Sequence, residues 1–242
     1  MSVRVRGQIN RHLPFSLVDG PGNRFVLFLQ GCNFDCVTCH NPQTIARSAS
    51  LSTPLSVDEI VKQIRECADY ISGITVSGGE PTLQVEFVRA LFDEIKGDPE
   101  LAHLTTFVDS NGAAPRRSWD LLRPVMDGAM IDLKALNPAV HMALTSRPNE
   151  SVLGSIKYLA DIGLLYEVRL LIVPGFNDSE DAVRHTAKWL QSVDPELPLK
   201  LIGFRKHGTR PETVVLDEPD SATMDLIAEQ YRAEGMKEIV VI

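Results

Sequence analysis

The chain has 242 residues, of which 44% are hydrophobic and 23% are charged, and its formal net charge is −8 at pH 7. An acidic chain without a lysine and arginine cluster lacks the basic surface that nucleic acids require. No stretch is long and apolar enough for a membrane helix, and no signal-peptide core follows the basic first residues. We therefore expect a cytoplasmic protein that binds neither nucleic acid nor membrane.

Apolar and β-branched runs alternate with amphipathic stretches along the whole chain. The runs are continuous rather than alternating, as expected of strands that are covered on both faces. Repeated strand–helix alternation predicts parallel βαβ units in an α/β fold, a partial (β/α)6-type open TIM barrel, and one domain over residues 1–242. The predicted strands are residues 25–30, 73–78, 105–110, 128–133, 168–174, 199–204 and 238–242, and the predicted helices are residues 56–71, 85–96, 117–125, 152–162, 179–193 and 221–235.

The first predicted helix shows the pattern in detail. Its residues Ile60, Ile64, Cys67 and Ile71 recur at helical spacing on one face, and Ser56 is placed to cap its N-terminus. Unusual polar and small residues follow nearly every predicted strand, in "SGGEP", "VDSNG", "MIDLK", "VPGFND" and "FRKHG". Barrels of this kind carry their chemistry at the C-terminal ends of the strands. We therefore expect these segments to lie at one face of the fold.

Three of the four cysteines, Cys32, Cys36 and Cys39, fall within eight residues after the first predicted strand. Thiols stay reduced in the cytoplasm, so such clustering indicates a metal site or catalysis rather than disulfides. A structural zinc site needs four ligands, and His40 and Cys67 are both poorly placed to be the fourth. Three cysteines suit a 4Fe–4S cluster with one iron open to a small molecule. The CxxxCxxC spacing thus favours iron–sulfur over zinc, with coincidence as the remaining alternative.

The cysteine spacing together with "SGGEP" resembles the radical S-adenosylmethionine (SAM) superfamily. The segments "FSLVDGPGNRFVLFLQGC", "CHNP", "ITVSGGEPTLQ", "VDSNG" and "MIDLKAL" resemble the glycyl-radical enzyme activases, a family that includes pyruvate formate-lyase-activating enzyme, and most closely its YjjW-type members. The likeness extends from Asn10 to the last predicted strand. It implies a radical SAM core in which Cys32, Cys36 and Cys39 hold a 4Fe–4S cluster whose open iron binds SAM.

The resemblance also places residues around the methionine part of SAM. Ser77, Gly78, Gly79 and Glu80 match the segment that approaches its amino group. Glycines allow a close backbone approach, and the Glu80 carboxylate suits an ammonium group. The alternative for this segment is a simple turn after a strand.

Further matches lie at the next two strand ends. Asp109, Ser110, Met130 and Asp132 match positions that help to bind a monovalent cation near the methionine carboxylate, and Lys134 matches a lysine directed at that carboxylate. Two neighbouring carboxylates would repel each other unless a cation lay between them. The alternative for Lys134 is a solvated lysine at the start of a helix.

The substrate side of the likeness is carried by three residues. Asp19 and Gly20 belong to the "DGPG" segment, near which the target glycine loop enters, and Arg169 lies on a strand that leads to the expected mouth. The alternative for the "DGPG" segment is a simple tight turn made by Gly20 and Gly22. His207 lies near, though not in register with, a histidine that lines the cofactor site, and an ordinary loop histidine is an equal alternative. Thr38 departs from the aromatic residue that many radical SAM proteins carry before the third cysteine. Adenine binding would then depend more on backbone contacts.

A second departure concerns electron supply. YjjW-type activases carry a cysteine-rich ferredoxin-like insertion after "CHNP", and here "QTIARSASLSTPL" takes its place. Flavodoxin or ferredoxin would then reduce the cluster directly. The resemblance implies that SAM is cleaved reductively to methionine and a 5′-deoxyadenosyl radical, which abstracts a Cα hydrogen from a glycine of a partner glycyl-radical enzyme.

Two alternatives to this function stay open. The first is a radical SAM enzyme that acts on another peptide or on a small molecule, since the cofactor motifs do not define the target. The second is a non-catalytic iron–sulfur electron carrier or a zinc-binding protein. The strands, the "GGEP" segment and the pair of carboxylates argue against the second alternative, because a carrier needs none of them.

Overall fold

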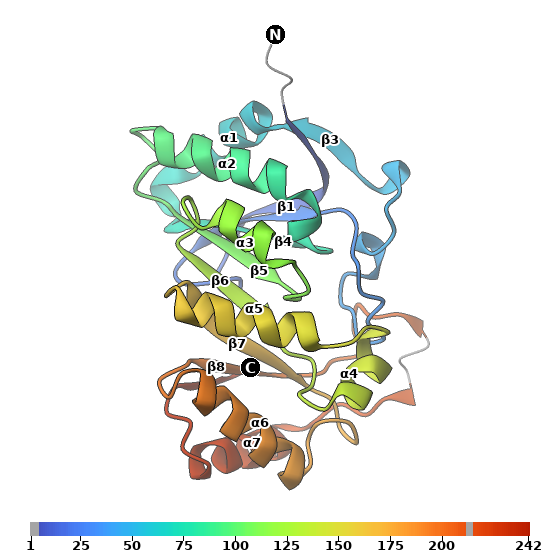
Figure 1. The fold of residues 1–242 in the computed structure, drawn as a ribbon. Helices are drawn as coiled ribbons and strands as arrows, with labels where there is room; N and C mark the ends of the chain where they lie inside the picture. The colour runs from blue at the N-terminus through green and yellow to red at the C-terminus, as the bar shows by residue number, and fades with distance from the viewer. Residues whose placement is uncertain (1–4, 212–214) are drawn as a thin grey trace. The chain divides into compact units, whose positions relative to one another are not determined.

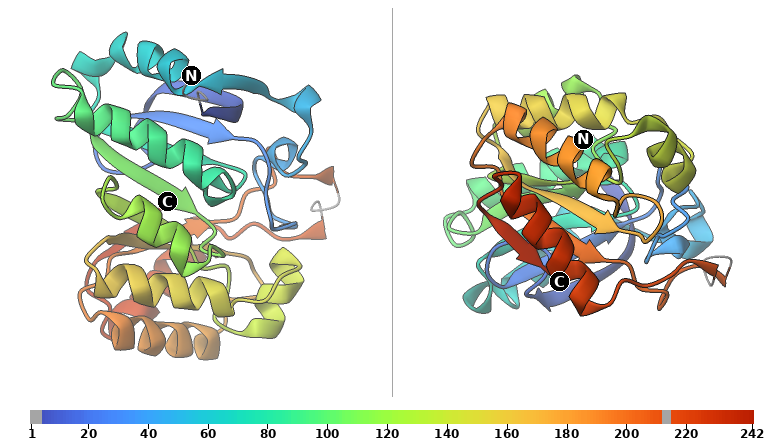
Figure 2. Two further views of the ribbon diagram at one scale, coloured as in Figure 1. Left: turned by 45° about the horizontal axis from the view of Figure 1, so that its top comes forward. Right: turned by 90° about the horizontal axis from the view of Figure 1, so that it is seen from below.

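The computed structural model describes residues 5–211 and 215–242 (Figures 1 and 2). The chain divides into two compact units. The first comprises residues up to 33, 43–110 and 114–130, and the second comprises residues 34–42, 111–113 and 131–242. The expectation of a single domain over 1–242 stays a prediction.

In the first unit the strands follow the order β3-β1-β2-β4-β5. β2, β4 and β5 pair in parallel, whereas β1 runs antiparallel to both of its neighbours, β2 and β3. The parallel strands confirm the predicted ones to within one residue, and β1 and β3 were not predicted. Their bounds are β1 Arg6–Ser16, β2 Arg24–Leu29, β3 Thr53–Ser56, β4 Gly73–Gly78 and β5 Thr105–Ser110.

The helices of this unit are α1 (Val57–Arg65), α2 (Val85–Gly97) and α3 (Arg116–Leu122), and α1 packs beside α2 (Figure 1). Ser56 caps α1 as predicted, in a capping box with Glu59. The predicted C-terminal end of this helix was wrong, because α1 ends at Arg65 and a short 3₁₀ turn follows. The apolar positions that the pattern selected are nevertheless all buried.

β6 (Gly128–Asp132) carries the chain from the first unit into the second. The second unit contains the parallel strands β7 (Leu165–Ile172), β8 (Leu199–Gly203) and β9 (Ile239–Val241), in that order. All of these strands were predicted, with ends that differ by up to three residues. Alternate residues of β7, namely Val168, Leu170 and Ile172, are fully or almost fully buried.

The described residues of the second unit form four helices, and α6 and α7 pack side by side (Figure 2). Three were predicted, whereas α4 was not. Its N-terminus is capped by Asn137, with proline at the first helical position. Along the described part of the chain, no helix has both the length and the apolar composition needed to cross a membrane. The bounds are α4 Pro138–Thr145, α5 Glu150–Asp161, α6 Glu180–Val193 and α7 Ser221–Ala233.

Candidate active site

The first cysteine of the motif lies in the first unit. Gly31, which precedes it, has φ +100° and accepts the left-handed conformation that an L-residue would resist. The backbone N–H of Gly31 donates to Thr44 O at 2.8 Å, and that of Cys32 donates to Ile45 O at 3.0 Å. The segment that leads away from the motif therefore fixes the backbone of Cys32.

Cys36 and Cys39 lie in the second unit, on a segment held by α4. The N–H of Asp35 donates to Thr145 O at 3.1 Å, and the N–H of Val37 donates to Leu144 O at 3.0 Å. These acceptors are carbonyls of the last turn of α4, which have no partner within the helix. The unpredicted helix α4 thus positions two of the predicted cluster ligands.

A buried aromatic contact adds to this attachment. Phe34 packs edge-on against His141 of α4 with ring centroids 5.7 Å apart, and both side chains are buried. Burial lowers the pKa of His141 from its ordinary value. The ring is therefore neutral at pH 7 and behaves as part of the apolar packing beneath the motif.

Lys134 is a cation near both of these cysteines, and Arg210 is a second cation near Cys39. Lys134 Nζ donates to Asp132 Oδ2 at 2.7 Å. Burial by itself lowers the pKa of Lys134, but the negative groups Asp132, Cys36 and Cys39 outweigh it, and the net shift is upward. Lys134 therefore stays charged. Its side chain is only 15% exposed, which argues against the alternative of a solvated lysine at the start of a helix.

The three motif cysteines are reduced and half-buried, whereas Cys67 is reduced and buried. Burial raises the pKa of Cys67 and of Cys39. Residues 5–211 and 215–242 hold no cluster of three histidine, cysteine or acidic side chains around a single ion position. Half-buried thiols beside a permanent cation nevertheless fit an anionic thiolate-bound cluster, because the ammonium group offsets part of its charge.

In the first unit the "SGGEP" segment ends β4 with a tight backbone approach. A Cβ on Gly78 would lie 2.2 Å from Leu29 N, and one on Gly79 would lie 2.2 Å from Gly31 O. Only glycine fits at either position without backbone movement. This close approach, and not merely a turn, accounts for both glycines.

Two hydrogen bonds join the ends of β4 and β5. Ser77 Oγ donates to Asp109 Oδ2 at 2.8 Å, and Ser110 Oγ donates to Glu80 Oε1 at 2.8 Å. The same Glu80 oxygen accepts from the N–H of Thr82 at 3.0 Å, and the carboxylate is fully buried. The structure thus brings together these four predicted residues of the first unit and fixes their orientation.

The remaining cofactor positions are distributed between the units. Met130 is buried at the end of the first unit's share of β6, while Asp132 belongs to the second unit, where it pairs with Lys134. His207 is exposed on the chain after β8. The predicted cation site draws on residues of both units and stays a prediction.

The predicted substrate residues have partners that the sequence did not suggest. In the second unit, Arg169 Nε donates to Glu167 Oε1 at 2.6 Å, and Lys200 Nζ lies 3.1 Å from the same oxygen. Only 8% of the Arg169 and Glu167 side chains and 13% of Lys200 are exposed. Two cations therefore share one buried carboxylate. The alternation of side chains on β7 could have placed Glu167 on the same face as Arg169, but it does not reveal the contact.

The "DGPG" segment belongs to the first unit and is held there by Arg24, a residue that the sequence analysis did not select. Asp19 accepts a hydrogen bond from Ser16 Oγ, its carbonyl accepts from Thr75 Oγ1 at 2.6 Å, and Gly20 has φ +132°. The buried guanidinium of Arg24 donates to Pro21 O at 3.2 Å and to Thr75 Oγ1 at 2.8 Å. Arg24 thereby connects the turn to the sheet.

Comparisons with known proteins agree with this geometry. The model of the radical SAM superfamily matches residues 26–190. The pyruvate formate-lyase-activating enzyme of Streptococcus mutans is 34% identical over 210 residues, which cover 85% of this chain and 80% of the relative. That of Staphylococcus aureus (strain USA300) is 30% identical over 244 residues, covering 96% of this chain and 97% of the relative.

Solved structures show the same fold. A domain of pyruvate formate-lyase-activating enzyme from Bacteroides vulgatus aligns with TM-score 0.58 and 24% identity over 71% of this chain and 99% of that domain. A radical SAM methyltransferase from Sphaerobacter thermophilus aligns with TM-score 0.69 and 18% identity over 90% of this chain and 66% of its own.

These matches confirm the predicted α/β fold with the partial barrel of radical SAM enzymes, and they confirm the resemblance to the activases. The special likeness to YjjW-type members stays a prediction. Membership of the superfamily implies a 4Fe–4S cluster and SAM as cofactors. The chain belongs to the radical SAM superfamily and, within it, to the family of the pyruvate formate-lyase-activating enzymes.

Proposed function

We propose that this enzyme activates a partner glycyl-radical enzyme by removing a Cα hydrogen from one glycine of that partner. The observation that carries the proposal is the attachment of the cysteine segment to α4, with the charged Lys134 beside Cys36 and Cys39. Identity of 30–34% to activating enzymes over most of the chain supports the same function. When bound, the cluster and SAM supply one-electron reductive chemistry.

The residues divide into three tasks in this proposal. Cys32, Cys36 and Cys39 hold the cluster. Lys134 is directed at the methionine carboxylate of SAM, and its permanent charge, sustained by Asp132, suits that task. The overall products are methionine, 5′-deoxyadenosine and a glycyl radical on the partner.

The strand ends of the first unit bind the remainder of the methionine moiety. Gly79 admits the amino group close to the backbone, and the buried carboxylate of Glu80 provides its charge partner. Ser77 and Ser110 hold the carboxylates of Asp109 and Glu80 in place by their hydrogen bonds. These tasks need fixed dipoles rather than proton transfer, which agrees with a radical reaction.

A monovalent cation would bind near the methionine carboxylate at Asp109, Ser110, Met130 and Asp132, and His207 would line the cofactor site. The likeness of these positions to those of the activases supports this cation.

On the substrate side, the glycine loop of the partner enters near Asp19 and Gly20 and contacts Arg169. Flavodoxin or ferredoxin supplies the electron from outside, and the reaction takes place in the cytoplasm, where such donors are reduced.

The test is anaerobic reconstitution with iron and sulfide, followed by reduction with dithionite. The electron paramagnetic resonance spectrum is recorded with and without SAM, and 5′-deoxyadenosine is assayed. We expect a cluster signal that shifts with SAM, together with 5′-deoxyadenosine and, when a partner is added, a glycyl radical. Replacing Cys36 with alanine should remove the cluster, whereas Cys67→Ala should retain it.

Other outcomes would point elsewhere. A cluster that does not respond to SAM would indicate an electron carrier. Zinc without iron would contradict the proposal outright. Formation of 5′-deoxyadenosine without a glycyl radical on any candidate partner would favour a different peptide or a small molecule as the substrate.

A further inference from the structure

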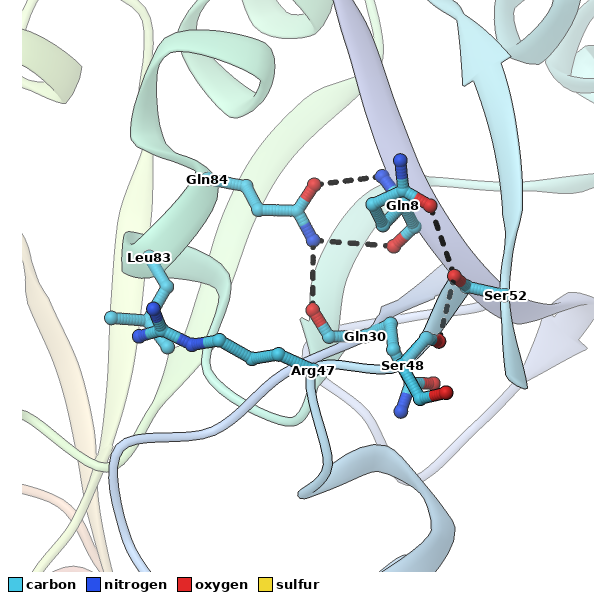
Figure 3. A pocket seen from close by; sticks show the side chains of 7 residues that line it. All are labelled: Gln8, Gln30, Arg47, Ser48, Ser52, Leu83 and Gln84. Carbon is cyan, nitrogen blue, oxygen red and sulfur yellow. Dashed lines mark hydrogen bonds between the residues drawn. The ribbon is translucent and has the colours of Figure 1, made fainter. Parts of the chain in front are cut away.

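A pocket lined mainly by residues with polar side chains lies in the first unit, outside the residues assigned above (Figure 3). Its volume is about 300 Å³. Its walls come from β1, from the residue after β2, from the residues on either side of the 3₁₀ turn at Ala49–Leu51, and from the 3₁₀ turn at Pro81–Gln84. All of these segments belong to one compact unit, so the shape of the pocket does not depend on the other.

One wall of the pocket is the side chain of Gln84, whose amide hydrogen-bonds both the backbone N–H and the backbone carbonyl of Gln8 in β1. Gln84 Oε1 accepts from the backbone N–H of Gln8 at 2.8 Å. Its Nε2 donates to Gln8 O at 3.2 Å and to Gln30 O at 3.0 Å, as the dashed lines in Figure 3 show. The amide of Gln84 is therefore fully engaged and fixed in orientation.

The neighbouring acceptors are also engaged. Gln30 Nε2 donates to two backbone carbonyls, Gln43 O at 2.8 Å and Ala46 O at 2.6 Å, and Gln30 Oε1 accepts from Asn10 Nδ2 at 2.9 Å. Gln8 Oε1 accepts from Ser52 Oγ at 2.9 Å. A ligand in the pocket would find these wall acceptors already hydrogen-bonded.

The groups that remain are donors. Within residues 5–211 and 215–242, the guanidinium of Arg47 makes no hydrogen bond or ion pair, and Gln8 Nε2 donates to no other side chain or carbonyl. In the same unit Arg6 and Arg65 each contact a carboxylate. Arg47 differs from these two arginines because it has no carboxylate partner among the described residues.

Two further contacts define the direction of Arg47. The methylene stem of Arg47 packs against the backbone at Gly31. If Gly31 carried a Cβ, that atom would lie 3.1 Å from Arg47 Cγ. Leu83, 37% exposed, provides an apolar surface at the same pocket. The pocket thus offers a planar cation, an amide donor and an apolar side, and no free acceptor among its glutamine amides.

We propose that this pocket, the Arg47 pocket (Gln8, Gln30, Arg47, Leu83 and Gln84), binds a carboxylate group that is attached to a short aliphatic chain. A guanidinium binds a carboxylate through two parallel hydrogen bonds. The adjacent methylene groups would pack on Leu83. The volume is at the lower end of the range for small-ligand sites, which suits a ligand no larger than a glutamate side chain.

The carboxylate can come from a free acid or from a glutamate side chain of a partner protein. The experiment separates these sources by titrating the full-length protein, followed by NMR or calorimetry, with glutarate and with a capped Gly-Glu-Gly peptide. Glutaramide is the uncharged control. Tighter binding of the peptide assigns the pocket to a partner protein, and tighter binding of glutarate assigns it to a free acid.

The matched variants are Arg47→Gln and Arg123→Gln, both at exposed positions of the same unit. We expect saturable binding by the unmodified protein and by Arg123→Gln, about tenfold to hundredfold weaker binding by Arg47→Gln, and none of glutaramide. Equal binding by Arg47→Gln and the unmodified protein, or binding of neither carboxylate, overturns the proposal. Circular dichroism verifies that both variants are folded, and no outcome depends on SAM cleavage.

Discussion

Replacing Arg24 with methionine tests whether one buried cation holds the start of the sheet in the first unit. The Arg24 side chain is fully buried. Its Nε donates to Thr75 Oγ1 at 2.8 Å, and Nη1 donates to Thr105 Oγ1 at 2.8 Å and to Pro21 O at 3.2 Å. Nη2 donates to Ile74 O at 2.6 Å and to Thr105 O at 3.0 Å. The guanidinium therefore joins three separate segments of the chain.

The magnitude follows from these contacts. Each hydrogen bond contributes a net ~0.5–1.5 kcal/mol, and more where the donor is charged. Methionine removes all of the donors, leaves buried carbonyls short of partners, and retains only the packing against the ring of Phe107, which lies 4.6 Å from the guanidinium carbon. Because the variant also avoids the desolvation of a cation, the contributions do not simply add. We expect the free energy of unfolding to fall by about 3–5 kcal/mol, because several hydrogen bonds from one charged, buried donor are lost together.

Urea unfolding of the cluster-free protein, followed by far-ultraviolet circular dichroism, measures this change. Arg6→Met is the matched control, because the Arg6 side chain is 51% exposed and its ion-pair partner Glu59 is 48% exposed. Such pairs contribute about 0–1 kcal/mol. The reasoning is refuted if Arg24→Met loses less than about 1 kcal/mol or no more than the control.

Three further changes have definite expected results. Glu167→Gln should weaken the orientation of Arg169, so that glycyl-radical formation slows more than 5′-deoxyadenosine formation; equal slowing of both would count against this. Gly79→Ala places a Cβ 2.2 Å from a backbone oxygen and should weaken SAM binding in calorimetry, whereas unchanged affinity would contradict the close approach. Burial by itself raises the pKa of Asp127. The charge of Lys96 and the hydrogen bonds from Lys96 and Thr106 lower it by more, so the net shift is downward. The Asp127 carboxylate therefore stabilises the folded state fully above its unfolded-state pKa, and this stabilisation disappears as the pH falls through its folded-state pKa. The stability difference between the unmodified protein and Asp127→Asn should shrink below about pH 4, and a constant difference would refute the shift.

The sequence predicted mainly those strands whose residues are mostly buried, because they appear as continuous apolar runs. All six residues of β2 are buried, and an uninterrupted apolar run is sufficient to indicate such a strand. β1 was missed because only Gly7 and Ile9 along its length are buried, so its pairing with neighbouring strands, rather than its composition, makes it a strand. β3 carries Pro54 at the edge of the sheet, which also conceals it.

α4 was missed for a different reason. A helix of eight residues is too short for a clear periodic pattern, and its start at Asn137 and Pro138 was the only strong signal. The consequence reaches the candidate site, because α4 holds the segment with Cys36 and Cys39.

Within the site, motifs identified residue types and the structure supplied their partners. Ser77 meets Asp109, and Glu80 meets Ser110, because β4 and β5 are parallel neighbours, and register is decided by the whole sheet rather than by either segment alone. The burial of Arg24 was equally hidden. Its acceptors come from residues about 3 to 81 positions away in sequence, a relation that no local pattern contains.

The way in which the cysteine segment is held affects the interpretation of its variants. The backbone amides of Asp35 and Val37 donate to α4, so the segment between the cysteines is fixed by hydrogen bonds that involve no sulfur atom. An ion pair between Asp35 and Arg210, and a contact of 2.8 Å between His40 Nε2 and Arg205 O, add attachments from the chain after β8.

Because these bonds persist when a thiol is replaced, loss of iron from Cys36→Ala would report the loss of a ligand and not the unfolding of the segment. The cluster-free protein should correspondingly hold the segment that carries Cys36 and Cys39 against α4 before iron binds. Preorganisation of this kind reduces the ordering that binding requires, and it would allow the cluster to be assembled on a chain that is already folded.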